Sequence, residues 1–157
     1  MSVLGDVAMV SAAELDTLRS EGNAYSYLSG TEVPKVDLDR YWDGLRFVMD
    51  ATGFPVNPIG GRPYPNERSA WGHGMPNSDS CALTPEEVRQ AAASLVATPF
   101  TALEIHLPAA NAAGLYPGNY DWTSLTTRTN AAHYYGTLVA FFQEAAAAGQ
   151  CTVFWAA

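Results

Sequence analysis

The chain has 157 residues, a length typical of one folded domain with its own hydrophobic core. It is acidic, with a formal net charge of −8, and its 8 Lys and Arg residues form no cluster. Nucleic acids and anionic membrane surfaces are bound by clustered basic residues, so the composition argues against both as partners. No apolar run reaches the roughly 18 residues that span a bilayer. The first ten residues also lack the basic start of a secretion signal, so we expect a cytoplasmic protein.

The N-terminal third predicts a strand followed by two helices. Residues 2–10 form the strand, with Val7 and Met9 on one face. Ser11 and Glu14 then have the spacing of a capping box, in which each side chain accepts a hydrogen bond from the backbone of the other. The first helix ends near Gly22, and residues 23–36 are expected to be a connection.

The second helix is the most strongly periodic segment. We expect it to begin at Asp37 as the N-cap residue and to end at Gly53. Apolar side chains recur along it at three- and four-residue spacing: Leu38, Tyr41, Trp42, Leu45, Val48 and Met49. Trp42 and Leu45 should be largely buried against the sheet.

A region rich in proline and glycine follows, over residues 54–80, and its composition excludes a long helix or a central strand. We expect it to be a long loop packed on the rest of the domain. A helix should then begin at Thr84, with Pro85 in the first turn and Glu87 completing a capping box. A weaker start signal at residues 98–99 predicts short helical turns that end at Gly114.

The C-terminal third predicts a turn, a helix and a strand. The turn, residues 115–122, is rich in aromatic residues, the last helix covers residues 128–148, and Gly149 ends that helix. Residues 151–155 form the closing strand. The whole chain, residues 1–157, is therefore expected to be a single compact α+β domain. In it, several helices pack on a small mixed sheet that contains the N- and C-terminal strands.

Four stretches of this chain resemble the YfbM-like family of small bacterial proteins, a family without an assigned function. They are residues 38–47, 83–88, 111–117 and 141–155, in the order and at about the spacing of the family. The Trp-Asp-x-Leu motif at Trp42 and the Tyr-Pro motif at Tyr116 are the most specific parts. The resemblance implies a compact mixed α/β fold whose last helix leads into a final strand. It implies no reaction and supplies no catalytic residues.

The sequence contains no local signature of a metal, cofactor or catalytic site. Its three histidines are far apart, no Cys-x-x-Cys occurs, and no glycine-rich segment completes a phosphate-binding loop, so we expect neither a metal nor a cofactor. Cys81 precedes a helix start, where a thiol pKa can be lowered, but a small buried apolar side chain is the favoured interpretation. Because two cysteines are too few for a secreted disulfide scaffold, Cys81 and Cys151 are both expected to be free thiols.

The best candidate for a binding site combines the long loop with the aromatic turn. Polar groups among aromatic walls are typical of small-molecule pockets, although the same aromatics can simply pack the loop on the domain. We expect at least two of the loop and turn residues to border one cleft: Glu67, Trp71, His73, Tyr116 and Trp122. Asp43, in the Trp-Asp-x-Leu motif, is a further candidate and alternatively accepts a hydrogen bond from a loop backbone.

Three classes of function remain open at this point, and the last of them is a structural or scaffold component with no ligand. The first is a non-enzymatic binding or protein-interaction domain, including an immunity-type protein that neutralises a partner, a role that small size and acidity suit. The second is a small hydrolase or transferase that uses His73 and a carboxylate in a cleft lined by loops. The sequence does not decide whether the chain is an enzyme, and it specifies neither a substrate nor an oligomeric state.

Overall fold

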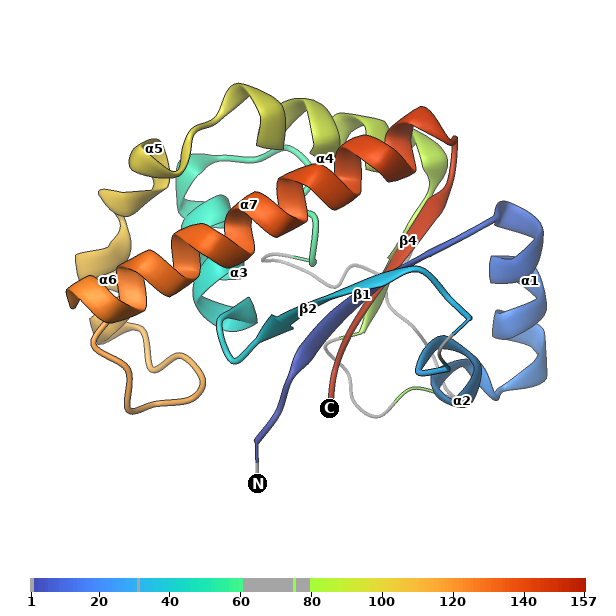
Figure 1. Cartoon of the computed structure of the whole chain (residues 1–157), viewed down its shortest axis with the longest axis horizontal. Coiled ribbons are helices and arrows are strands. Elements are labelled where there is room, and N and C mark those ends of the chain that lie inside the picture. The colour runs from blue at the N-terminus through green and yellow to red at the C-terminus, as the bar shows by residue number, and fades with distance from the viewer. Residues whose placement is uncertain (1, 31, 61–74, 76–79) are drawn as a thin grey trace.

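A four-stranded sheet lies at the centre of the structure, a computed structural model that describes residues 2–30, 32–60, 75 and 80–157. Its strand order is β2-β1-β4-β3 (Figure 1). The strands are β1 (Gly5–Val10), β2 (Lys35–Asp39), β3 (Cys81–Leu83) and β4 (Cys151–Ala156). The N- and C-terminal strands pair in the middle of the sheet. All three pairings are antiparallel, whereas the expected sheet was mixed.

Seven helices flank this sheet in the described part of the chain. They are α1 (Ala12–Glu21), α2 (Ala24–Leu28), α3 (Trp42–Thr52), α4 (Pro85–Ala97), α5 (Phe100–Glu104), α6 (Leu107–Ala112) and α7 (Leu125–Ala147). Helices α3 to α7 lie together over one face of the sheet, while α1 and α2 lie apart from them (Figure 1). Among the residues described, no helix combines the length and the apolar character that crossing a bilayer requires.

Strand β4 is buried on both faces because it separates two hydrophobic cores. Alternate side chains of a strand point to opposite faces. Phe154 accordingly packs in the larger core, under α3 to α7, whereas Val153 and Trp155 pack in the smaller core, under α1 and α2. In β1, Val7 and Met9 both contact the larger core, which confirms that they share a face.

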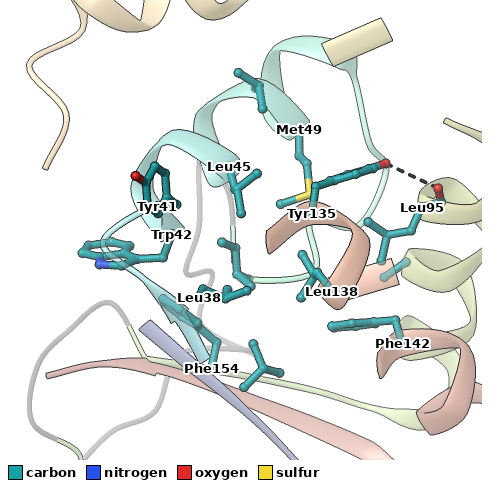
Figure 2. Close-up of a cluster of buried hydrophobic side chains, with 14 of the residues drawn as sticks. Leu38, Tyr41, Trp42, Leu45, Met49, Leu95, Tyr135, Leu138, Phe142 and Phe154 are labelled. Carbon is teal, nitrogen blue, oxygen red and sulfur yellow. Dashed lines mark hydrogen bonds between the residues drawn. The ribbon is translucent and has the colours of Figure 1, made fainter. Parts of the chain in front are cut away.

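The larger core is built around α3 and α7 (Figure 2). Trp42 is 4% exposed and Leu45 is 1% exposed, so the expected burial of both is confirmed. The Trp42 ring lies 5.9 Å from that of Phe154 on β4, and its indole N–H donates to the Val3 carbonyl at 3.1 Å. On α7, the Tyr135 hydroxyl donates to the backbone carbonyls of Leu95 in α4 and of Thr98, the C-cap residue of α4, which fixes these two helices against each other.

The expected helix start at Asp37 is wrong. Residues 35–39 pair with β1 as strand β2, and the helix begins only at Trp42. Asp39 turns the chain with a positive φ of 49°, and its backbone N–H donates to the Asp37 carboxylate at 2.6 Å. Leu38 lies in the larger core as part of a strand, and it would also lie there as part of a helix. Its apolar character therefore did not distinguish a strand from a helix. Strand β3 and helix α2 were also not anticipated.

Most helix ends agree with the signals in the sequence. Ser11 and Thr84 both complete capping boxes, with Glu14 and Glu87 respectively. Gly53 ends α3 in the left-handed conformation, which only glycine adopts without strain. Helix α7 begins three residues earlier than expected, because the Ser124 hydroxyl accepts the Thr127 N–H and caps it.

Candidate functional site

Asp43 joins the two motifs that carry the family resemblance. It lies in the first turn of α3, and its side chain is 16% exposed. Its Oδ1 accepts a hydrogen bond from Arg46 at 2.8 Å, and its Oδ2 accepts the backbone N–H of Tyr116 at 2.9 Å. The alternative that Asp43 binds a loop backbone is therefore what the structure shows. A carboxylate with both oxygens engaged ties the 115–122 turn to α3.

Tyr116 is held at three points. Besides its backbone contact with Asp43, its ring stacks on Trp42 at 5.7 Å, and its hydroxyl accepts the Val3 N–H at 2.6 Å. The bond between Tyr116 and Pro117 is a cis peptide. The Tyr-Pro motif and the Trp-Asp-x-Leu motif thus form one unit, although 73 residues separate Asp43 from Tyr116.

Trp122 has a packing role in this structure. Its side chain is 2% exposed, and its ring lies over Gly44, where a Cβ atom would approach it to 2.2 Å. Its backbone N–H donates to the Asn111 side chain at 2.8 Å. Trp122 also contacts Tyr41 edge to face, with ring centroids 6.1 Å apart. These contacts bring the far end of the turn against α3, one residue along from Asp43.

A cleft of about 410 Å³ opens beside Asp43. Helix α3 forms one wall and the segment after α6 forms the other. We call it the Asp43 cleft, and its described lining consists of Asp43, Arg46, Phe47, Asp50, Ala51, Ala113 and Leu115. This lining combines apolar and charged side chains, a composition that can hold a small amphipathic ligand. Neither Tyr116 nor Trp122 belongs to this described lining, although Leu115, next to Tyr116, does.

The wall formed by α3 is stiffened by Asn57, a residue that the sequence analysis missed. Asn57 is fully buried, and its side-chain amide donates to the Arg46 carbonyl at 3.0 Å and to the Asp50 carboxylate at 2.9 Å. Its own side-chain oxygen accepts the Ile59 N–H at 3.2 Å. The spacing of Asp43, Arg46 and Asp50, three and four residues apart, could have indicated one polar face of a helix.

Three of the sequence candidates, Glu67, Trp71 and His73, lie outside the described residues. The expectation that two of the five loop and turn residues share a cleft therefore stays a prediction. The structure does bring Asp43 and Tyr116 together, and Leu115, at the start of the turn, lines the Asp43 cleft.

Neither cysteine has the environment of a reactive thiol. Both are free and buried. Burial raises the pKa of Cys81 to about 12, and burial also raises the pKa of Cys151. The interpretation of Cys81 as a small buried apolar side chain is thereby supported over a helix-activated thiolate. Among the residues that the structure describes, no three His, Cys, Asp or Glu side chains gather as a metal site would require.

The sheet, its two cores and the helices over them define a small α+β fold. The family described as "Domain of unknown function (DUF1877)" matches residues 1–155, and the chain belongs to this family. Its structure is similar to the crystal structure of YfbM from Escherichia coli, described as a protein of unknown function, with a TM-score of 0.70 and 15% sequence identity. That match covers 98% of this chain and 99% of YfbM, so it shows a shared fold and confirms the resemblance to the YfbM-like family. No curated protein is significantly similar to the chain.

Proposed function

We propose that this chain is a non-enzymatic binding domain of the bacterial cytoplasm, and that its ligand occupies the Asp43 cleft. The observation that carries the proposal is the cleft itself, at about 410 Å³. Pockets for small ligands measure roughly 300–1,000 Å³ and combine an apolar surface with a few fixed polar groups. Phe47 and Leu115 supply the apolar surface here, and Asp43 with Arg46 supplies the fixed polar groups.

The charged groups at the cleft favour binding over catalysis. Asp43 uses one oxygen for Arg46 and the other for the Tyr116 backbone, which leaves it poorly placed to exchange a proton with a substrate. The described lining contains no hydroxyl, thiol or imidazole that could act as a nucleophile or base. The alternative of a small hydrolase or transferase depends on His73, which lies outside the described residues.

A protein partner is one form that this ligand can take. A side chain of a partner would fit a cleft of this size, and a net charge of −8 favours a partner that is basic. Neutralisation of such a partner, an immunity-type role, is compatible with a small acidic domain. The same charge and the absence of a basic cluster in the sequence disfavour nucleic acid.

A thermal-shift screen of small metabolites and short peptides tests the proposal, because a ligand that binds only the folded state raises the melting temperature. Ala51→Trp fills the cleft from an exposed position on α3, and Ala140→Trp makes the same change on the exposed face of α7, away from it. We expect stabilisation by a ligand to be lost in Ala51→Trp and kept in Ala140→Trp. Equal shifts in both variants would place the ligand elsewhere, and no shift with any compound would refute a small-ligand role for the cleft.

A further inference from the structure

Two hollows border Tyr27, which lies on the side of the sheet opposite to α3. Tyr27 lies on the short helix α2, and its side chain is 44% exposed. Its hydroxyl donates to Glu14 Oε2 on α1 at 2.6 Å, while Glu14 Oε1 accepts the Ser11 N–H at 2.9 Å. The hydrogen bonds fix the exposed ring in one orientation. An exposed tyrosine of this kind is a frequent energetic centre of protein interfaces.

Tyr27 lines two hollows. The first, of about 250 Å³, has apolar walls from Met9 and Val33 and carries the Glu32 carboxylate. The second, of about 290 Å³, has an apolar wall from Leu18 and carries the Glu21 carboxylate. Glu14 and Tyr27 border both. The described lining of each hollow contains no Lys or Arg, so carboxylates are the only charged groups beside the tyrosine ring and the apolar walls.

This combination matches the side chains of lysine and arginine. Their aliphatic stems pack on apolar surfaces, while their cationic ends interact with carboxylates and with aromatic rings. We propose that the two hollows beside Tyr27 bind neighbouring Lys or Arg side chains on a basic segment of a partner protein. The hydrogen bond from Tyr27 lowers the pKa of Glu14, so this carboxylate is charged at neutral pH and contributes to that binding.

The charge of the whole chain supports a basic partner over a second copy of itself. With 16 Asp and Glu residues against 8 Lys and Arg, two copies would repel each other. The inference does not depend on the Asp43 cleft, because α1 and α2 pack on one face of the sheet and α3 packs on the other. A negative binding result at one of the two surfaces therefore does not count against the other. Variants at the two sites show which of the two proposals has failed.

Fluorescence anisotropy with a labelled peptide of alternating Arg and Gly, added to the full chain, tests the proposal. The matching Glu-Gly peptide controls for charge. Tyr27→Ala should weaken binding of the basic peptide about tenfold, because it removes the ring that makes a cation–π contact and the apolar surface of that ring. Tyr27→Phe keeps the ring and should stay within about threefold of the wild type. Tyr25→Ala is the matched control, since Tyr25 is 40% exposed on the same helix but borders neither hollow.

Charge variants test the surface independently, in case Tyr27→Ala disturbs α2. Glu21→Gln and Glu32→Gln each remove one exposed carboxylate from a hollow and should each weaken binding about threefold. Glu104→Gln on α5 removes the same charge elsewhere and should change binding by less than about twofold. Equal losses in all three charge variants, or equal affinity in Tyr27→Ala and Tyr25→Ala, would show unspecific attraction to an acidic protein and overturn the proposal. Dimerisation of the chain through Tyr27, detected by light scattering, would overturn it as well.

Discussion

Substituting Gly44 by alanine tests how the aromatic turn is seated on α3. A Cβ atom at Gly44 would lie 2.2 Å from Cη2 and 2.3 Å from Cζ3 of the Trp122 ring. Nonbonded carbon atoms prefer about 3.5–4.0 Å, so the ring would have to move by more than about 1 Å. It has little room to do so, because it is 2% exposed and is flanked by Tyr41 and Tyr120.

The expected effect of this substitution is the difference between two opposing terms. Overpacking a buried site costs typically 1–3 kcal/mol, and the required ring movement places Gly44→Ala at about 3 kcal/mol. Replacing a helical glycine by alanine returns about 0.5–1 kcal/mol. We therefore expect Gly44→Ala to lower the free energy of unfolding by about 2 kcal/mol.

Urea denaturation followed by circular dichroism measures this change, and Gly136→Ala is its matched control. Gly136 is exposed within α7, and a Cβ atom there meets nothing within 4 Å. That variant should gain about 0.5–1 kcal/mol from helix propensity alone. The two substitutions should thus change stability in opposite directions. If Gly44→Ala is as stable as Gly136→Ala, the described packing of Trp122 on α3 is wrong.

Three further predictions concern charged groups and thiols. Asp43→Asn places an amide where the carboxylate accepts hydrogen bonds from Arg46 and Tyr116. It should lower the free energy of unfolding, measured by urea titration, by about 1–3 kcal/mol. An unchanged midpoint would contradict the anchoring role of Asp43. Burial raises the pKa of Asp6 from 3.8 to about 6, and the Asp37 carboxylate opposite it on β2 adds to this rise. The neutral form of Asp6 therefore contributes stability that is complete below about pH 4 and is lost as the pH rises through 6. Asp6→Asn should therefore stabilise the protein at pH 7, by about 1 kcal/mol after allowance for its partial exposure, and should have no effect at pH 4; equal effects at both pH values would refute this. Thiol titration at pH 8 should find no fast-reacting group in the folded protein and two after denaturation without a reductant, since both cysteines are free and buried; rapid labelling of the folded protein would contradict their burial.

Local signals predicted the ends of the helices well. The capping boxes at Ser11 and Thr84 and the terminal glycine Gly53 depend only on residues within one turn, and the structure has each of them as expected. Such signals are strong because the unpaired backbone groups at a helix end must find partners nearby.

The segment before α3 shows where local reasoning fails. Leu38, Tyr41, Trp42 and Leu45 have helical spacing and are all buried, yet Leu38 belongs to β2. The strand forms because β1 offers backbone hydrogen bonds, a partner about thirty residues away that periodicity does not reveal. Strand β3 was missed for a related reason. Its three residues are too few to show an alternating pattern, and its pairing with β4 depends on the distant C-terminal segment.

The candidate site was predicted in part. Asp43 was singled out from the sequence, with a contact to a loop backbone as one of two alternatives, but the sequence could not show that the loop residue is Tyr116, because that contact spans 73 positions. Arg46, Asp50 and Asn57 were not singled out, since their interaction depends on a turn of the chain after α3 that no local motif specifies. Trp122 is buried in the core, and whether two of the five loop and turn residues share a cleft stays a prediction.

The central claim, that the Asp43 cleft is a binding site, is tested most directly by mapping where a ligand binds. The measurement is backbone amide NMR with the first compound that raises the melting temperature. We expect the largest shifts at Phe47, Ala51 and Ala113, which line the cleft. We also expect these shifts to disappear in Ala51→Trp. Shifts confined to residues outside the cleft, or unchanged shifts in that variant, would contradict the claim.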